Sequence, residues 1–124
     1  MGYYVKFESK KICLRKDIPE WLIQFFLDTD VSKVENPDHA LFKTDRCSSL
    51  FCNHSVIRPY LFRKGNNGYY ELSLYCEIKY GWDEIRAFAD WITPFVAGHK
   101  KKEYIGWMQG EGRNYRENIY IERL

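Results

Sequence analysis

The feature that most constrains the fold of this chain is a strand, a helix and a second strand that follow one another between residues 69 and 109. From Tyr70 to Tyr80 apolar and polar residues alternate, which is typical of a strand with one buried face. The apolar positions are Leu72, Leu74, Cys76, Ile78 and Tyr80, and the polar positions are Glu71, Ser73, Glu77 and Lys79. We predict that the apolar set faces a core.

A helix is predicted where this alternation stops. Asp83 and Glu84 lie where a helix N-terminus favours negative charge, and Pro94 predicts the end of the helix within about one turn. The apolar residues that recur at helical spacing between these signals are Ile85, Phe88, Ala89 and Ile92. After a basic connector, the alternation returns over residues 103–109 and predicts the second strand.

The rest of the chain predicts hairpins and one more helix. Residues 3–8 alternate and turn at Ser9-Lys10 into residues 12–15, which indicates a short hairpin. A helix with a broad apolar face is predicted after Asp17, which is placed to cap it, and it should end near residues 28–30. A strand at residues 60–62 should turn tightly at residues 65–68 into the strand that begins at Tyr70. Residues 110–114 should turn the chain into a last strand at residues 118–122.

These elements predict a single α+β domain over residues 1–124. We expect a twisted antiparallel sheet of about five to six strands with two helices packed on one face. The expected order is ββα-loop-ββα-ββ, with a long irregular loop at about residues 29–57.

Composition narrows the classes of function. The net charge is +2, from 19 Lys and Arg against 17 Asp and Glu. Strong polyanion binders carry a larger positive charge, and acidic nucleic-acid mimics carry a large negative charge, so the overall charge indicates neither class. The N-terminal residues lack the pattern of a signal peptide, and no apolar run is long enough to span a membrane. We therefore expect a soluble cytoplasmic protein with reduced cysteines, of which Cys13 and Cys76 are predicted to be small core residues.

The last 55 or so residues carry a resemblance. The run from Trp82 to Val96, the Tyr104-Ile105-Gly106-Trp107 strand and the acidic Glu111 resemble a group of small uncharacterised proteins encoded by phages and prophages. The resemblance covers about residues 70–124 and does not extend to the first 68. It implies a mobile-element origin and a setting in the cytoplasm of a bacterial host cell, and it transfers no catalytic residues.

The long loop holds a group of zinc-type ligands. Thiolates and imidazoles are the ligands that zinc prefers, and the loop contains His39, Cys47, Cys52 and His54. Cys47 and Cys52 are separated by more residues than in the usual Cys-x2-Cys motif, so loop thiols and surface histidines are the simpler interpretation. We expect no cofactor and keep zinc at these four residues as an alternative.

We expect no catalytic residues. Cys52 and His54 alternate along the chain, so on an extended backbone they point to opposite sides and do not pair as nucleophile and base. The sequence contains no Gly-x-Ser-x-Gly motif of serine hydrolases, no His-Glu-x-x-His motif of zinc proteases and no phosphate-binding Walker loop. A helix N-terminus explains Asp83 and Glu84 without catalysis.

Two surfaces are candidates for binding. The solvent-exposed side of the expected sheet should present a mixed aromatic and charged face to a protein partner. This face is formed by Tyr69, Tyr75, Glu77, Lys79, Tyr104, Trp107 and Tyr120. The alternative is a basic stripe next to aromatic rings, which would suit single-stranded nucleic acid, formed by Lys100, Lys101, Lys102, Arg113 and Arg116.

The expected function is therefore a non-catalytic protein-binding module, either monomer or homodimer. The resemblance to phage proteins implies an inhibitor of a host antiphage defence factor, similar in role to an anti-CRISPR protein, with a nuclease or a defence-complex subunit as its partner. The alternatives are a single-stranded nucleic-acid-binding protein and a small-ligand or nucleotide-binding protein.

Overall fold

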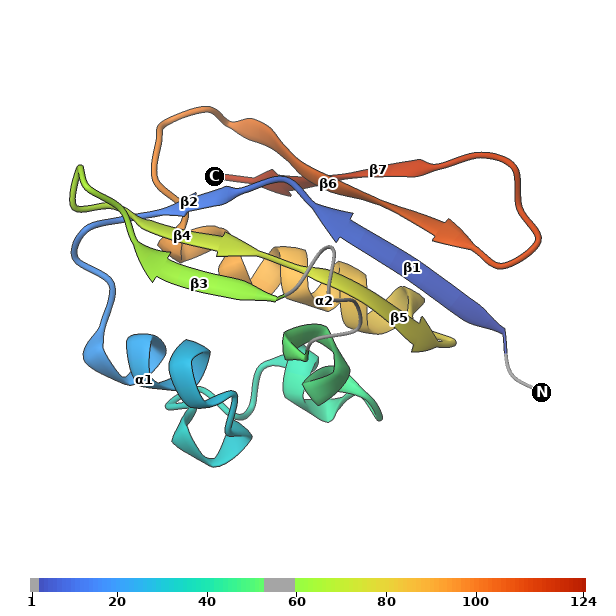
Figure 1. The fold of residues 1–124 in the computed structure, drawn as a ribbon, viewed down its shortest axis with the longest axis horizontal. Coiled ribbons are helices and arrows are strands. Elements are labelled where there is room, and N and C mark those ends of the chain that lie inside the picture. Colours follow the sequence, from blue (N-terminus) through green and yellow to red (C-terminus); the bar gives the residue numbers. More distant parts are fainter. Residues whose placement is uncertain (1–2, 53–59) are drawn as a thin grey trace.

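The computed structural model describes residues 3–52 and 60–124. These residues form two α-helices and seven strands, together with short 3-10 turns (Figure 1). The strands are β1 (Tyr4–Ser9), β2 (Ile12–Leu14), β3 (Leu61–Lys64), β4 (Tyr70–Ser73), β5 (Tyr75–Lys79), β6 (Lys102–Gly110) and β7 (Glu117–Glu122). The helices are α1 (Glu20–Asp28) and α2 (Trp82–Ile92). The 3-10 turns are η1 (Val31–Lys33), η2 (Ala40–Lys43), η3 (Cys47–Phe51) and η4 (Thr93–Phe95).

The strands form two antiparallel sheets, of order β5-β1-β6-β7 and β2-β4-β3. The α+β class and the antiparallel pairing are confirmed, whereas the single sheet of five to six strands is wrong. The predicted strand from Tyr70 to Tyr80 is divided at Leu74, because the Leu74 amide donates to the Ser9 hydroxyl at 2.8 Å instead of to a neighbouring strand. The Ser9 amide donates back to the Leu74 carbonyl at 2.9 Å, so the two sheets meet at this point.

The first predicted hairpin is also wrong. β1 and β2 do not pair with each other, because β1 lies between β5 and β6 while β2 pairs with β4. The chain bends at residues 10 and 11 and passes from one sheet to the other (Figure 1). Local alternation cannot distinguish a bend of this kind from a tight hairpin turn, since both interrupt a strand for two residues.

The other two hairpins are confirmed. β3 pairs with β4 around a turn in which Gly68 has a φ of +89°, a backbone conformation that glycine adopts at little cost. β6 pairs with β7 around a second turn, in which Gly112 has a φ of +78°. Both turns depend on residues close in sequence, which is why the sequence pattern located them.

The helices begin and end close to the predicted residues. α2 ends at Ile92, just before Pro94, and buries the predicted apolar residues together with Trp91. α1 begins after Pro19, which is the N-cap residue, and Asp17 does not cap it. No α-helix among the described residues is long and apolar enough to cross a lipid bilayer.

Aromatic rings join the helices to the sheets in one core. Phe7 of β1 packs on Phe88 of α2 at a centroid distance of 6.0 Å, and Phe26 of α1 packs on Phe62 of β3 at 4.9 Å. Phe25 of α1 meets Trp91 of α2 edge to face. Both helices therefore lie on the side to which the buried residues of β4 and β5 point.

The described part of the segment between α1 and β3, up to residue 52, contributes to the same core. Leu41, Leu50 and Phe51 of the 3-10 turns η2 and η3 are buried. Glu84 of α2 is 4% exposed, and its Oε2 accepts a hydrogen bond from the Arg46 amide at 2.9 Å. Glu84 thus holds this segment in place in addition to lying at a helix N-terminus.

Cys13 differs from its predicted position. It is exposed on β2, whereas its neighbours Ile12 and Leu14 are buried, so the alternation of this short strand runs opposite to the expectation for Cys13. Cys76 is buried as predicted.

Candidate functional site

The four-stranded sheet has one side that faces the helices and another side that they do not cover. Val5, Phe7, Cys76 and Ile78 point to the helices and are buried. The residues between them point away, and we call this side the outer face. It is formed by Tyr4, Lys6, Glu8, Tyr75, Glu77, Lys79, Tyr104, Trp107, Gln109, Asn118, Tyr120 and Glu122.

The strand register places charged and aromatic side chains of this face in rows. Lys6 of β1 lies opposite Glu77 of β5 on one side and Gln109 of β6 on the other. Glu8 lies in the same way between Tyr75 and Trp107. Cross-strand neighbours at this spacing contact one another directly, so the face alternates polar and aromatic rows.

A β-bulge brings Tyr104 and Trp107 to the same side. These residues are three positions apart, and in a regular strand an odd separation would place them on opposite faces. The register between β6 and β7 shifts between Tyr104 and Gly106, so that Tyr104 pairs with Tyr120 and Trp107 pairs with Asn118. The bulge buries Ile105 and turns both rings outward.

Cations and neighbouring rings hold the aromatic side chains of the outer face. The Arg116 guanidinium lies 3.9 Å from the centre of the Trp107 ring, and the Lys102 ammonium lies 4.7 Å from that of Tyr120. Tyr104 and Tyr120 meet edge to face at 5.8 Å and are 37% and 40% exposed. The rings are thus partly ordered before any partner binds, which lowers the entropy cost of binding.

The outer face is hollowed at the end that holds the β6–β7 turn. A hollow of about 360 Å³ lies between Tyr4 and Lys6 of β1, Glu77 of β5, Gln109 of β6 and residues 110–113 of the turn. Lys6 Nζ lies 3.9 Å from Glu77 Oε1 across it. Two basic and two acidic residues line this hollow, so it suits a ligand surface of mixed charge rather than a polyanion.

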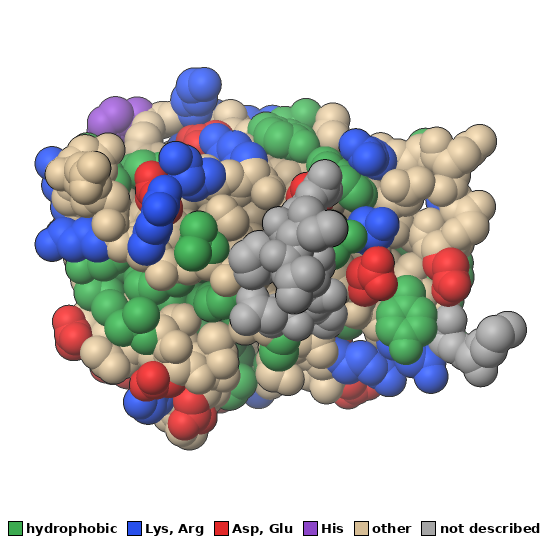
Figure 2. Space-filling model, viewed as in Figure 1, with side chains coloured by type: hydrophobic (Ala, Val, Ile, Leu, Met, Phe, Trp, Pro, Cys, Tyr) green, Lys and Arg blue, Asp and Glu red, His purple; other side chains and the backbone are tan. Residues whose placement is uncertain are grey.

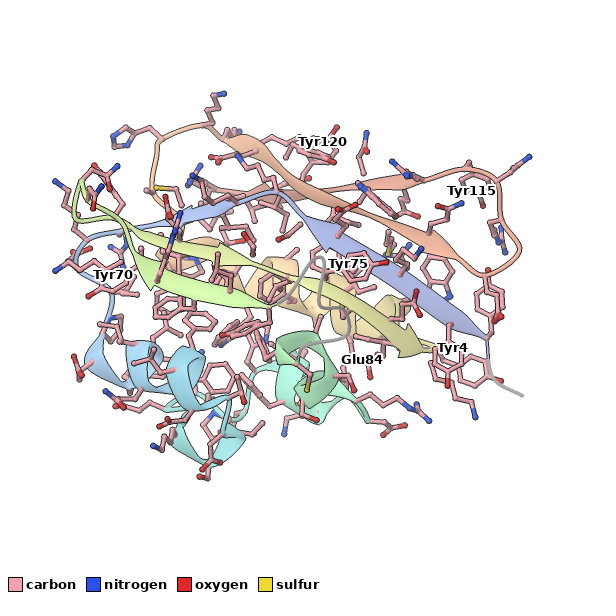
Figure 3. All side chains as sticks on the ribbon, viewed as in Figure 1. Tyr4, Tyr70, Tyr75, Glu84, Tyr115 and Tyr120 are labelled. Atoms are coloured by element: carbon pink, nitrogen blue, oxygen red, sulfur yellow. The ribbon has the colours of Figure 1, made fainter. Side chains whose placement is uncertain are left out.

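Six of the seven residues predicted for the partner face lie on the outer face. The exception is Tyr69, which lies in the β3–β4 turn of the other sheet. The ammonium of Lys16 lies 4.8 Å from the centre of its ring. Tyr75 begins β5, an edge strand of the four-stranded sheet, and lies opposite Glu8 of β1 (Figure 3).

The residues predicted for nucleic acid do not form one stripe. Lys100, Lys101 and Lys102 lie at the start of β6, whereas Arg113 and Arg116 lie in the turn that follows its end. Arg116 covers Trp107 and Arg113 lies beside Gln109, so about 15–25 Å of β6 separates these arginines from Lys102. Arg113 is also engaged by tyrosines, since its Nε donates to the Tyr3 hydroxyl at 3.2 Å and its Nη1 to the Tyr115 hydroxyl at 2.6 Å.

The residues predicted as zinc ligands take part in other contacts. Cys52 Sγ donates to the Ser48 carbonyl at 3.1 Å, and burial raises the pKa of the Cys47 thiol, which disfavours the thiolate that a metal needs. His54 lies outside the described residues. Within residues 3–52 and 60–124 no group of three or more potential metal ligands lies together.

His39 forms a pair with an acidic residue that the sequence did not suggest. Its Nδ1 accepts a hydrogen bond from the Leu41 amide at 3.0 Å, so the ring proton lies on Nε2, which is 2.8 Å from Asp90 Oδ2. Nδ1 thus caps η2 and Nε2 joins it to α2, so both ring nitrogens are occupied by contacts within the fold.

Sequence reasoning missed Tyr80. This residue is exposed, lies at the end of β5 and has a φ of +55°, which is uncommon for a bulky side chain. The alternation of the preceding strand placed it among the core residues. The only signal was the following Gly81, which indicates a turn but not the direction of the Tyr80 ring.

Comparison with known proteins identifies no relative: no family model matches the chain, and no curated protein or solved structure gives a significant match.

Proposed function

We propose that this chain is a non-catalytic protein-binding module whose partner docks on the outer face. The observation that carries the proposal is that this side of the four-stranded sheet, which the helices leave uncovered, presents ordered aromatic rings between charged side chains. Rigid rings supply buried area at low entropy cost, and charges set the register of a partner.

The size of the outer face fits a modest protein interface. Four strands at about 4.8 Å and a longest strand of about 30 Å give roughly 600 Å² in projection. A standard interface buries about 800 Å² on each partner, so the face and its neighbouring turns reach that range. The hollow next to Tyr4 would receive a side chain or turn of the partner.

The resemblance to phage and prophage proteins supports a more specific role. We propose that the partner is a host defence factor, such as a nuclease or a subunit of a CRISPR complex, and that the chain inhibits it by occlusion. An inhibitor that acts in this way needs a binding surface and no catalytic group.

Affinity capture from lysate of a bacterial host, read by mass spectrometry, tests this proposal. Trp107→Ala and Tyr120→Ala should each abolish capture of the partner that the unchanged chain retains. Truncating an aromatic hot-spot residue at the centre of an interface costs about 2 kcal/mol or more of binding free energy. Leu27→Ala removes an exposed apolar side chain from α1 and should leave capture unchanged.

The proposal is wrong if folded Trp107→Ala and Tyr120→Ala proteins capture the same partner as well as the unchanged chain does. Circular dichroism and urea unfolding establish that the variants are folded.

A further inference from the structure

Lysine and arginine side chains gather at one end of the molecule. The α2–β6 connector and the β3–β4 turn lie there, and the bend between β1 and β2 lies next to them toward the middle of the molecule (Figure 1). Figure 2 shows a concentration of basic side chains over this region. Ala97 donates its amide to the Cys13 carbonyl at 2.9 Å, which ties the connector to β2. We call this region the basic end, and it comprises Lys10, Lys11, Lys16, Arg63, Lys100, Lys101 and Lys102.

The charge of the basic end exceeds that of the whole chain. Its seven cations face two carboxylates, Glu71 and Glu103, which leaves a local charge of +5 against +2 for the chain. The opposite charges of the neighbouring Arg123 and Glu122 cancel, so these two residues do not change the sum. The remaining residues therefore carry a net charge of −3, and the modest overall charge conceals a strong separation of charge.

Both carboxylates are already paired. Glu71 lies 3.2 Å from Lys11 Nζ and 2.7 Å from Arg63 Nε, and Glu103 lies 3.5 Å from Lys10 Nζ and 3.4 Å from Arg123 Nη1. Among the described residues, no carboxylate lies within ion-pair distance of Lys16, Lys100, Lys101 or Lys102. These four ammonium groups are thus available to an anionic ligand.

Aromatic rings lie beside these lysines. Lys16 lies over the ring of Tyr69, and Lys102 lies over the ring of Tyr120. The Tyr104 ring packs edge to face on that of Tyr120. A hollow of about 400 Å³ opens between Lys10, residues 97–100 and residues 102–104, where the Glu103 carboxylate is already paired with Lys10 and Arg123. Ammonium groups next to exposed rings are the combination that binds phosphates and stacks bases in proteins that bind single strands.

We propose that the basic end binds single-stranded nucleic acid, with backbone phosphates on Lys16 and Lys100–Lys102 and with bases stacked on Tyr104 and Tyr120. Arg113 and Arg116 take no part, because they lie beside Gln109 and Trp107, away from the lysines at the start of β6. This inference does not rest on the proposed protein partner. The two surfaces share Tyr104 and Tyr120, whereas the phosphate-binding lysines lie only at the basic end.

Fluorescence anisotropy with a labelled oligothymidine of about 12 nucleotides tests the inference. Four phosphate contacts at a slope of about −0.7 each predict that affinity falls about 50-fold between about 50 mM and about 200 mM salt. In the triple variant Lys100→Ala, Lys101→Ala and Lys102→Ala, one contact remains, and the same salt change should weaken binding only about 3-fold. The triple variant should fold, since all three side chains are exposed.

A charge-matched control separates this site from general attraction. Lys33→Ala, Lys43→Ala and Arg46→Ala remove the same charge from the η1–η3 segment and should leave the salt dependence near that of the unchanged chain. Tyr120→Ala should weaken binding of the single strand about 5- to 150-fold while leaving that of duplex DNA almost unchanged.

The inference is overturned if both triple variants lose affinity and salt dependence equally. It is also overturned if the oligothymidine does not bind at about 100 µM protein in low salt, or if a duplex of equal length binds as well as the single strand.

Discussion

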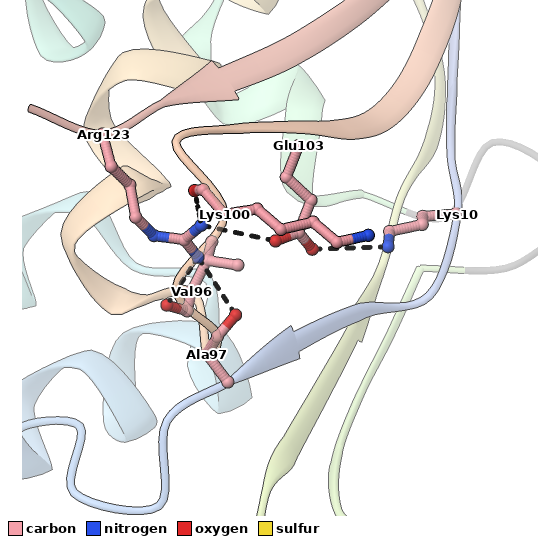
Figure 4. Close-up of polar contacts among 6 residues, drawn as sticks. All are labelled: Lys10, Val96, Ala97, Lys100, Glu103 and Arg123. Atoms are coloured by element: carbon pink, nitrogen blue, oxygen red, sulfur yellow. Dashed lines mark hydrogen bonds and ion pairs between the residues drawn. The ribbon is translucent and has the colours of Figure 1, made fainter.

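Arg123, one residue after β7, should contribute strongly to stability although it lies near the C-terminus. Its guanidinium donates to the carbonyls of Val96, Ala97 and Lys100 and to the Glu103 carboxylate (Figure 4). The distances to Val96, Ala97 and Glu103 are 3.2, 3.0 and 3.4 Å. One planar side chain thus fixes the connector between α2 and β6, and a lysine could not reach these acceptors simultaneously.

Replacing Arg123 by methionine keeps the apolar stem and removes all four hydrogen bonds. A hydrogen bond to a charged group contributes about 1.5–3 kcal/mol, but these four share one group and water can reach the freed carbonyls. Because the Arg123 side chain is 18% exposed, water replaces part of what is lost, and the total loss is smaller than the sum of four separate hydrogen bonds. We expect the free energy of unfolding to fall by about 2–3 kcal/mol.

Urea unfolding followed by tryptophan fluorescence measures this loss. With a slope of the usual size for a small domain, the midpoint should move down by about 1–2 M. Arg63→Met is the matched control, because it also removes an arginine from a carboxylate but its side chain is 59% exposed and Lys11 remains on Glu71. It should cost about 0.5 kcal/mol or less. Equal losses in the two variants would refute the reasoning.

Three further predictions concern single positions. Gly106→Ala should lower stability by about 1–3 kcal/mol in urea unfolding, because the new Cβ would lie 2.7 Å from the Ser9 Cα of β1; an unchanged midpoint would show that the strands yield without cost. Burial raises the pKa of Tyr60 above its usual value of about 10, so the stability that depends on its neutral hydroxyl is present below about pH 10 and is lost as the pH rises further. Unfolding at about pH 8 and about pH 10.5 should therefore show a smaller alkaline loss in Tyr60→Phe than in the unchanged chain, and equal losses would contradict this. Thiol labelling read by mass spectrometry should modify exposed Cys13 in the folded protein and buried Cys76 only after unfolding, and rapid native labelling of Cys76 would contradict its burial.

Elements that depend on neighbours in the chain were predicted well. The helix between Gly81 and Pro94 follows from spacing, charge and a proline within about 14 residues of one another, and the structure places α2 there. The β3–β4 and β6–β7 hairpins follow in the same way from their turn residues.

The candidate site was predicted only in part. The alternation of apolar and polar residues predicted that Tyr75, Glu77 and Lys79 lie on one side of their strand, and the structure places them on the outer face. It could not separate Tyr69 from that face, because the break at Leu74 depends on the Ser9 hydroxyl, 65 residues away. It also grouped Arg113 and Arg116 with the connector lysines, since proximity in sequence says nothing about the length of the strand between them.

By itself the sequence determined the α+β class, the two helices and two of the hairpins, because hydrophobic period, turn residues and helix signals act over one or two turns of chain. Only the tertiary structure decided the order of the strands, the division into two sheets and the bulge that brings Tyr104 and Trp107 to one side. These features arise from hydrogen bonds and packing between segments far apart in sequence, whose partners no local pattern identifies. The separation of charge that defines the basic end has the same origin, since β2, the β3–β4 turn and the α2–β6 connector become neighbours only on folding.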